Sequence, residues 1–300
     1  MSSTEKKNII SIIGAGKTGS ALALELYSAG YKIGCVVDRK KRQAAKIAGL
    51  VKAENYLISV NAECVHSSKL IVISVKDDVL AEAVEEISYF SDVSSNTLLA
   101  HTSGVHTSSA LLPSGFKKNN IASFHPMQSF MDISLYNRSL LSGIYFGLEG
   151  GTNALKYLKS ICRKLNSDFI VIDKKVKPLY HIACVIASNF LTANFGFISA
   201  LAESMNVSEK KITASLIPLA ETTLANIKRC GPLKSMTGPV ARNDTGTILR
   251  HLSLIDSKHP GYLLQYAAVT SHLADMAVKC NKITKDEKKV ILKILERFLK

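Results

Sequence analysis

Residues 9–38 read IISIIGAGKTGSALALELYSAGYKIGCVVD and contain a complete strand–turn–helix–strand unit. The β-branched run at residues 9–13 predicts a buried strand, the apolar spacing after residue 19 predicts a helix, and a second apolar run closes on Asp38. The turn between strand and helix has the spacing GxGxxG, which in this order of elements predicts a dinucleotide-binding unit. Its six residues, all expected to contact the dinucleotide, are Gly14, Ala15, Gly16, Lys17, Thr18 and Gly19.

The glycines of this turn and the acid that ends the second strand each have a mechanical role. Gly14 permits the tight turn off the strand, Gly16 lets the backbone approach a pyrophosphate, and Gly19 lets the helix pack closely on the sheet. The helix N-terminus presents unpaired N–H groups to the phosphates. Asp38 is suitably placed to accept hydrogen bonds from the adenosine ribose.

A basic cluster follows Asp38 and bears on the choice between NAD and NADP. Arg39 and residues 40–42 are all basic. A carboxylate favours the free ribose hydroxyl of NAD, whereas adjacent guanidinium and ammonium groups can hold the 2′-phosphate of NADP. We therefore expect NADP(H), with Arg39 as a contact and NAD(H) as the alternative cofactor. A solvated helix start is the alternative interpretation of the basic residues.

The composition favours a protein with large apolar cores and argues against several functional classes. Of the 300 residues, 47% are hydrophobic, which suffices for one large domain or two ordinary ones. The N-terminal MSSTEKKN lacks the apolar core of a secretory signal, and no apolar run is expected to reach the roughly 20 residues that span a bilayer. The six scattered cysteines show no metal-binding spacing. We expect a cytoplasmic protein without a metal site and without membrane contact.

The formal net charge of +14 raises the question of a nucleic-acid partner. The basic residues are spread along the chain, and no nucleic-acid-binding motif accompanies them. An anionic cofactor and a carboxylate substrate would use part of this charge. We therefore expect a small-molecule carboxylate as substrate and no nucleic acid.

Further predicted strands deliver candidate site residues to the carboxyl edge of the sheet. The apolar run 70–75 is typical of a strand buried on both faces, and Val75 at its end is a candidate cofactor contact. Strands at 97–100 and 121–124 are followed by Ser103 and His125, which we expect on the nicotinamide side of the site. The alternative role of a histidine in such a turn is to hold the loop by a hydrogen bond.

The alternation of strands and helices stops at residue 173, and from residue 178 the apolar residues follow helical spacing. The predicted fold is therefore α/β, a Rossmann-like domain with a mostly parallel sheet over residues 1–173, followed by an all-α domain over residues 174–300. The helical domain is expected to contact substrate and to form a homodimer. Pro218 is expected to bend or divide the second of its helices.

The first predicted helix of that domain, at residues 178–205, carries a polar stripe. His181 and Ser188 are seven residues apart and so lie on one face, two turns apart, with Asn189 beside them. A ligand could lie between these side chains; alternatively, they only satisfy neighbouring groups in a buried helix. We favour a site, because this helix follows directly from the sheet and can cross the cofactor cleft.

A second candidate region is the Gly- and Pro-rich connection at residues 231–247. Connections of this length within compact domains are often functional. Arg242 could bind a substrate carboxylate through two hydrogen bonds, and Asp244 could orient that arginine. A surface salt bridge is the alternative.

With these residues in place, the chain resembles the two-domain reductases of the 6-phosphogluconate dehydrogenase-like superfamily. It resembles more closely the proteins that join a Rossmann-like domain to a C-terminal helical domain of formerly uncharacterised function. The resemblance covers nearly the whole chain and rests on the segments IGAGKTGSAL, ISVKDD, HTSGV, SFHPMQSF, YHIACVIASNFLTA, NIKRCGPLKSMTGPVARND and YLLQYAAVTSHLA.

Some members of this group are similar in activity to ketopantoate reductase, the NADPH enzyme of pantothenate synthesis. The better-known ketopantoate reductases carry a Lys-x3-Asn-x3-Asn helix. Setting its last asparagine against Asn189 puts His181 at the lysine position and Val185 at the first asparagine, so this chain replaces the lysine with another proton donor. In the closer group an Arg-Gly-Asp sequence follows the Gly-Pro turn, and Asn243 stands here for its glycine.

We therefore predict an NADPH-dependent oxidoreductase that reduces the carbonyl of a small 2-oxo acid bound between the domains, with ketopantoate as the best guess. His181 would be the general acid, Ser188 and Asn189 would hydrogen-bond the carbonyl oxygen, and Arg242 would hold the carboxylate. The alternatives are an imine reductase resembling pyrroline-5-carboxylate reductase, a non-catalytic NADP(H)-sensing protein, and an oligomeric scaffold that keeps only the fold.

Overall fold

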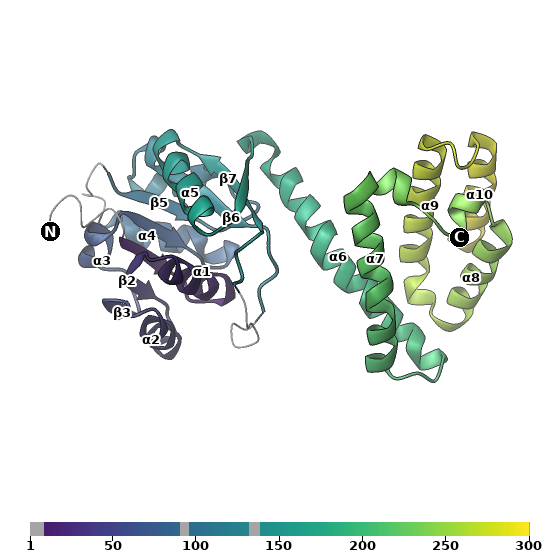
Figure 1. Ribbon diagram of the computed structural model, residues 1–300, viewed down its shortest axis with the longest axis horizontal. Helices are drawn as coiled ribbons and strands as arrows, with labels where there is room; N and C mark the ends of the chain where they lie inside the picture. Colours follow the sequence, from purple (N-terminus) through teal and green to yellow (C-terminus); the bar gives the residue numbers. More distant parts are fainter. Residues whose placement is uncertain (1–8, 91–95, 132–138, 300) are drawn as a thin grey trace. The chain divides into compact units, whose positions relative to one another are not determined.

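A computed structural model describes residues 9–90, 96–131 and 139–299 (Figure 1). Contacts within the chain define two compact units, residues 1–188 and residues 189–300. The expected boundary at residue 173 precedes the long helix α6 (Lys177–Ser204), whereas the division falls inside that helix. The first turns of α6 therefore belong to the α/β unit.

The first unit is built on an eight-stranded sheet with the order β3-β2-β1-β4-β5-β6-β7-β8. The first six strands run parallel in the order typical of dinucleotide-binding folds. Strand β7 is antiparallel to β6, and β8 is parallel to β7. The predicted fold class is confirmed. The strands are β1 (Ile9–Ile13), β2 (Lys32–Val37), β3 (Asn55–Leu57), β4 (Leu70–Ile73), β5 (Leu98–His101), β6 (Ile121–Pro126), β7 (Tyr145–Gly150) and β8 (Asp168–Val171).

Helices cover both faces of this sheet and bury its alternating side chains (Figure 1). Ile10 and Ile12 pack in one core with α1, α2 and α5, whereas Ile71 and Ile73 pack in the other with α3 and α4. Burial on both faces explains why β1 and β4 are continuous apolar runs. The helices are α1 (Lys17–Ser28), α2 (Lys41–Leu50), α3 (Ala62–Ser67), α4 (Leu80–Ser88) and α5 (Thr152–Lys164), with short 3-10 turns η2 (Asp77–Val79), η3 (Ser108–Ser114), η4 (Lys118–Asn120) and η6 (Lys174–Val176).

The strand order determines where a ligand can enter the first unit. The chain passes from β1 to β2 on one side and later returns to β4 on the other side of β1. At this switch point the helices that follow the neighbouring strands lie on opposite faces of the sheet and leave a crevice at the carboxyl ends. The glycine turn begins at the carboxyl end of β1, in this crevice.

The described part of the second unit is helical, in agreement with the predicted all-α domain. Helices α8, α9 and α10 pack together (Figure 1) around a core that includes Ile248, Leu252 and Ile291. Thr284 and Glu287 form a capping box at the start of α10. The helices after α6 are α7 (Glu209–Ser235), α8 (Thr245–Lys258), α9 (Leu263–Lys279) and α10 (Lys285–Phe298), with 3-10 turns η7 (Val240–Arg242) and η8 (Pro260–Tyr262).

The division of the helix predicted at Pro218 is wrong, because the interruption of α7 lies at Gly231, where φ is 78° and ψ is 165°. The alternative, a bend at Pro218, stays a prediction. Pro218 sits on an exposed stretch of the helix, so water can reach the carbonyl group that loses its partner. Gly231 adopts a positive φ at little steric cost, and Pro232 then occupies the first position of a new turn, where its missing N–H is harmless.

Helix α6 also corrects an expectation from the sequence. Residues 174–204 are long and apolar enough to cross a membrane. Their most apolar stretch of 18 residues has a mean hydropathy of 1.6, and none of this stretch is buried. The expectation that no apolar run reaches this length is therefore wrong. Residues 178–202 contain no Asp, Glu, Lys or Arg, and their scattered Ser, Thr and Asn residues hardly lower the mean hydropathy. Leu179 and Phe190 are 65% and 56% exposed. The homodimer expected through the helical domain stays a prediction.

Candidate active site

The glycine turn between β1 and α1 is closed against β4 and open on its other side. Gly14 has a φ of +95°, and a β-carbon there would clash with the carbonyl oxygen of Ser74. A β-carbon at Gly19 would clash with the carbonyl oxygen of Gly14. Gly16 differs, because no atom lies within 4 Å of its β-carbon position. Its backbone is therefore accessible to a ligand at the positive end of α1.

A groove of about 510 Å³ runs along the carboxyl ends of β1, β2 and β4. Ala15 lines an adjoining hollow of about 290 Å³, and Gly19 is packed under the turn. The structure thus brings the predicted cofactor residues together at one edge of the sheet. Those that line the groove itself are Gly14, Gly16, Lys17, Thr18, Asp38, Arg39 and Val75.

Asp38 joins the glycine turn to the start of α2. Its Oδ2 accepts a hydrogen bond from the N–H of Ala15 at 2.8 Å, and its Oδ1 accepts one from the N–H of Lys40 at 2.8 Å. Each carboxylate oxygen can accept a further hydrogen bond, so the predicted ribose contact is compatible with this structural role. The ribose contact stays a prediction.

Arg39 lines the groove and forms an ion pair with Glu82 on α4, and the two side chains are 69% and 60% exposed. Exposed ion pairs contribute little free energy, so a phosphate dianion can replace the carboxylate at low cost. We expect Arg39→Ala to raise the KM for NADPH about 10-fold and to leave the KM for NADH nearly unchanged. Glu82→Gln is the matched control, because it removes the ion pair and keeps the arginine. An equal loss for both cofactors would contradict a 2′-phosphate contact.

A second hollow of about 340 Å³ continues from the groove and contains two of the predicted substrate residues, Ser103 and His125. Gly104 lies beside them. Because the groove and this second hollow share lining residues, a dinucleotide in the groove can extend its far end toward His125. The shared residues are Thr18, Val75, Lys76 and Thr102.

Two imidazole rings and a phenol meet at the end of β6. The Nδ1 atom of His125 and the hydroxyl oxygen of Tyr180 are 2.6 Å apart, and the His125 and His181 rings lie edge to face with centroids 5.9 Å apart. The Nε2 atoms of the two histidines lie 2.9 and 3.0 Å from the β-carbon position of Gly104. Gly147 on β7 makes room for the Tyr180 hydroxyl in the same way. This packing needs glycine at both positions.

His101, at the end of the neighbouring strand β5, has a framework role. Its Nδ1 accepts from the N–H of Ser103 at 3.2 Å, and its Nε2 lies 3.1 Å from the carbonyl oxygen of Thr107. The hydroxyl of Ser103 accepts from the N–H of His106 at 3.0 Å. These bonds hold the loop that carries Gly104. Of the two strand-end histidines, His101 thus holds a loop, whereas His125 faces the hollow.

Burial, with a smaller effect from the Lys177 charge, lowers the pKa values of both His101 and His125 to about 4. In the unfolded chain a histidine titrates near pH 6.5, so between about pH 6.5 and about pH 4 the unfolded state binds protons that the folded state does not. The free energy of unfolding should therefore be highest above this window and fall on acidification, by about 3 kcal/mol at most for each histidine. Both histidines are uncharged in the folded protein at neutral pH.

Urea denaturation at about pH 7.5 and about pH 4.5 tests this dependence. We expect the loss of stability on acidification to be smaller in His101→Gln than in the natural protein, because one of the two proton-binding sites is gone. His66→Gln, at an exposed histidine on α3, is the matched control and should lose as much stability as the natural protein. An acid loss that is equal in all three proteins would contradict the assignment.

Lys177 and Tyr180 were not predicted from the sequence. Lys177 is fully buried, and its Nζ donates to the hydroxyl oxygen of Ser123 at 2.5 Å. Tyr180 directly precedes His181 on α6. A lysine at the start of an apolar helix is usually exposed to solvent, so nothing in the sequence indicated that Lys177 is buried. The neighbouring Tyr-His pair was the signal that could have found Tyr180.

The remaining residues predicted to be catalytic or to bind substrate lie away from β6 along the chain. Ser188 is exposed at the end of the first unit, and Asn189, Arg242 and Asp244 belong to the second unit. Asp244 caps α8, with Oδ1 accepting from the N–H of Thr247 at 3.0 Å and Oδ2 from its hydroxyl at 2.7 Å. Asn243 has a φ of 52°, a left-handed conformation that suits asparagine and glycine. The roles proposed for Ser188, Asn189, Arg242 and Asp244 stay predictions.

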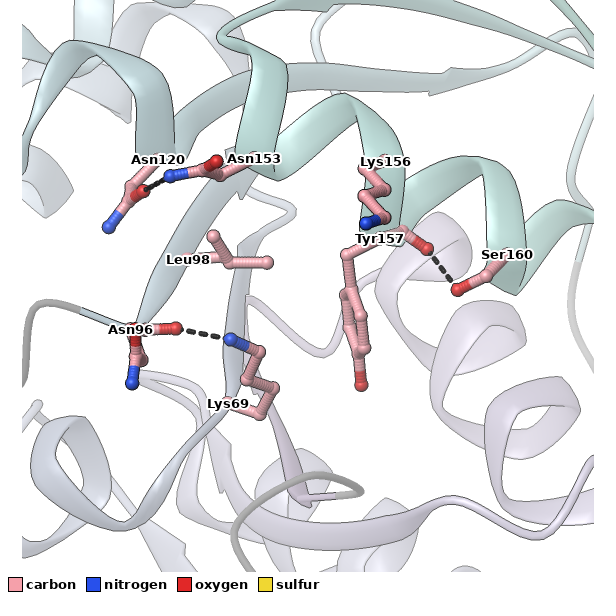
Figure 2. Close-up of a pocket in the computed structure, with 8 residues that line it drawn as sticks. All are labelled: Lys69, Asn96, Leu98, Asn120, Asn153, Lys156, Tyr157 and Ser160. Atoms are coloured by element: carbon pink, nitrogen blue, oxygen red, sulfur yellow. Dashed lines mark hydrogen bonds between the residues drawn. The ribbon is translucent and has the colours of Figure 1, made fainter. Parts of the chain in front are cut away.

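A further cavity, of about 410 Å³, lies at the opposite edge of the sheet, where β4, β5 and β6 begin (Figure 2). Figure 2 shows that several of its polar side chains form hydrogen bonds within the protein: Lys69 donates to the carbonyl oxygen of Asn96 at 2.5 Å, and Asn153 donates to the side-chain oxygen of Asn120 at 2.9 Å. None of the predicted site residues lines this cavity. The candidate chemistry therefore belongs to the carboxyl edge.

Comparisons with known families match two parts of the chain. Residues 9–99 match the family described as NADP oxidoreductase coenzyme F420-dependent. Residues 144–274 match a domain of unknown function, DUF2520. Among curated proteins, none matches the sequence.

Solved structures share the fold at low sequence identity. A Bacteroides fragilis protein proposed to be an NADP oxidoreductase is 24% identical, with a TM-score of 0.73 over 90% of this chain and 99% of that one. The imine reductase from Myxococcus stipitatus, in complex with NADP+, is 17% identical, with a TM-score of 0.60 over 97% and 100%. Pyrroline carboxylate reductase from Plasmodium falciparum, with NADP bound, is 15% identical, with a TM-score of 0.60 over 96% and 99%.

Proposed function

We propose that this NADP-dependent oxidoreductase, in which a Rossmann domain of the NADP oxidoreductase family is joined to a DUF2520 domain, reduces the carbonyl group of a small 2-oxo acid. The observation that carries the proposal is the continuity between the groove beside the glycine turn and the hollow that contains Ser103 and His125. The bound cofactor would supply hydride at that end of the groove.

The protein's own groups would handle the oxygen and the proton. With the Tyr180 hydroxyl donating to Nδ1, the uncharged His125 ring carries its hydrogen on Nε2, the atom that faces Gly104. In this position His125 can donate a hydrogen bond to a carbonyl oxygen as negative charge develops on it. His181 would then donate the proton, because its ring lies edge to face with the His125 ring, beside the position of that oxygen.

The substrate's identity is the finer part of the proposal, and ketopantoate is our first candidate. Net positive charge on the protein suits a carboxylate substrate, and Arg242 is the predicted partner of that carboxylate. Ser188 and Asn189 keep their predicted contacts with the substrate's oxygen atoms. The imine reductase is the alternative supported by fold likeness, and it would require less proton donation to the product.

A substrate screen that follows NADPH absorbance tests the proposal. We expect turnover with ketopantoate or a related 2-oxo acid that exceeds turnover with pyrroline-5-carboxylate by at least about 10-fold. Faster reduction of pyrroline-5-carboxylate would favour the imine reductase. Tight NADPH binding without oxidation by any carbonyl or imine compound would favour a sensing protein, and no saturable binding would favour a scaffold.

A further inference from the structure

Lys177, the first residue of α6, is a buried cation without a carboxylate in contact. Its side chain is 0% exposed, and no ion pair found within residues 9–90, 96–131 and 139–299 includes it. Removing an ammonium group from water without an opposite charge beside it is strongly unfavourable. An apolar side chain of similar length would fill the same space at a lower cost, so the amine calls for a role other than packing.

The hydrogen bonds of Lys177 lead to the loop beside the two imidazoles. Nζ donates to the hydroxyl oxygen of Ser123, and that hydroxyl donates to the carbonyl oxygen of Ser103 at 3.2 Å. Ser123 is itself fully buried on β6. Gly104 follows Ser103 directly and packs against His125 and His181. The lysine is therefore bonded, through one serine, to the turn that positions both rings.

The charge of Lys177 is not neutralised at close range. Glu149 on β7 is the carboxylate with the largest effect on the pKa of Lys177, but both its oxygens accept hydrogen bonds from Ser108, at 2.5 Å from the N–H and 2.8 Å from the hydroxyl. Burial lowers the pKa of Lys177 to about 8, so the amine is largely protonated at neutral pH. Its field therefore reaches the neighbouring imidazoles.

His125 feels this field together with several other groups. The titratable and charged groups around it are Lys177, Tyr180 and His181 on α6, His101 on β5 and Asp77 in η2. After burial, the positive charge of Lys177 has the largest effect on His125, and it opposes protonation of the ring. Asp77 acts in the opposite direction with a smaller effect.

We propose that Lys177 is a positioning residue of the reductase site: through Ser123 it holds the Ser103–Gly104 turn, against which His125 and His181 pack. Its charge also adds to the effect of burial, because it opposes protonation of His125. An uncharged His125 can donate a hydrogen bond from Nε2 to the substrate oxygen without itself titrating near neutral pH, which leaves proton transfer to His181. The consequence for turnover rests on the proposed function. The charge state of His125 does not, since it can be measured without substrate.

The decisive measurement is the pH titration of the His125 ring by NMR in the full-length protein, with the resonance assigned by its loss in His125→Gln. In the natural protein we expect a midpoint near the pKa of about 4. Lys177→Met should raise the midpoint by about one pH unit or more, because the nearby positive charge is gone. Lys210→Gln, at an exposed lysine of α7, is the control and should leave the midpoint unchanged.

Two further variants separate charge from positioning and guard against a folding failure. Lys177→Gln keeps a hydrogen-bond donor for Ser123 and loses the charge. If Lys177→Met does not fold, the His125 midpoint is therefore measured in Lys177→Gln. Ser123→Ala keeps the charge and breaks the chain to Ser103. With the substrate found in the screen, it should lower kcat about 10-fold or more, with NADPH affinity and the His125 midpoint unchanged.

The outcomes distinguish this proposal from the proposed function. An unchanged His125 midpoint in a folded Lys177 variant would overturn the charge role even if the enzyme is active. An unaffected kcat in Ser123→Ala would overturn the positioning role. A raised midpoint in a protein that reduces no carbonyl or imine compound would leave the charge role in place and reject the reduction.

Discussion

Gly16→Ala should abolish NADPH binding in practical terms, with an affinity loss of at least about 100-fold, while the protein keeps its thermal stability. The added methyl group meets no protein atom within 4 Å, and Gly16 has a φ of −65°, which alanine adopts freely. The methyl group would instead project into the groove, where the pyrophosphate must approach the backbone. Fluorescence titration with NADPH and a thermal melt measure the two effects.

Gly49→Ala is the matched control for Gly16→Ala. Gly49 lies in α2, has no atom within 4 Å of its β-carbon position and does not line the groove. This variant should bind NADPH normally and gain slightly in stability, since alanine is the better helix former. Gly19→Ala should by contrast lose both stability and binding, because its methyl group clashes with the turn itself. Normal NADPH affinity in Gly16→Ala would place the pyrophosphate elsewhere.

His181→Ala is expected to lower kcat by about 100-fold or more and to change the Kd for NADPH by less than about 2-fold. Removing a general acid typically costs two to four orders of magnitude in rate. Cofactor affinity should survive, because His181 is not among the residues that line the groove. Steady-state kinetics with the substrate from the screen, together with NADPH titration, provide both numbers.

The exposed His66 on α3 supplies the matched control, since it lines neither the groove nor the hollow that contains His125. His66→Ala should leave both kcat and affinity unchanged. Gly104→Ala gives an independent check, because its methyl group would displace the His181 ring and would lie only 2.9 Å from Nε2 of His125 without removing either ring. Full turnover in His181→Ala would remove the acid assignment and leave the cofactor groove intact.

The parts of the fold that follow from local sequence were predictable. Gly14 and Gly19 need no side chain because the chain folds back on itself within a few residues, and strand ends such as His125 follow from buried apolar runs. The helical nature of residues 189–299 follows from apolar spacing alone. In these regions, each residue's role depends on neighbours close to it in the chain.

The parts that depend on distant packing were not predictable. The bond between His125 and Tyr180 joins residues that are 55 positions apart, and the buried amine of Lys177 meets Ser123 across 54 positions. The need for glycine at Gly147 depends on a tyrosine from another element. Such contacts depend on how α6 packs against the sheet. Neither the composition nor the periodicity of a single sequence predicts that packing.

Asp38 constrains how the nucleotide preference of this protein could be retuned. Installing an acid that recognises the ribose is the natural route toward NADH, yet here the acid is already present and its two oxygens tether the glycine turn to α2. Exchanging it would loosen the very loop that receives the pyrophosphate. Selectivity in this scaffold is therefore adjustable at the edge of the groove, through Arg39 and its basic neighbours, while Asp38 keeps the glycine turn attached to the start of α2.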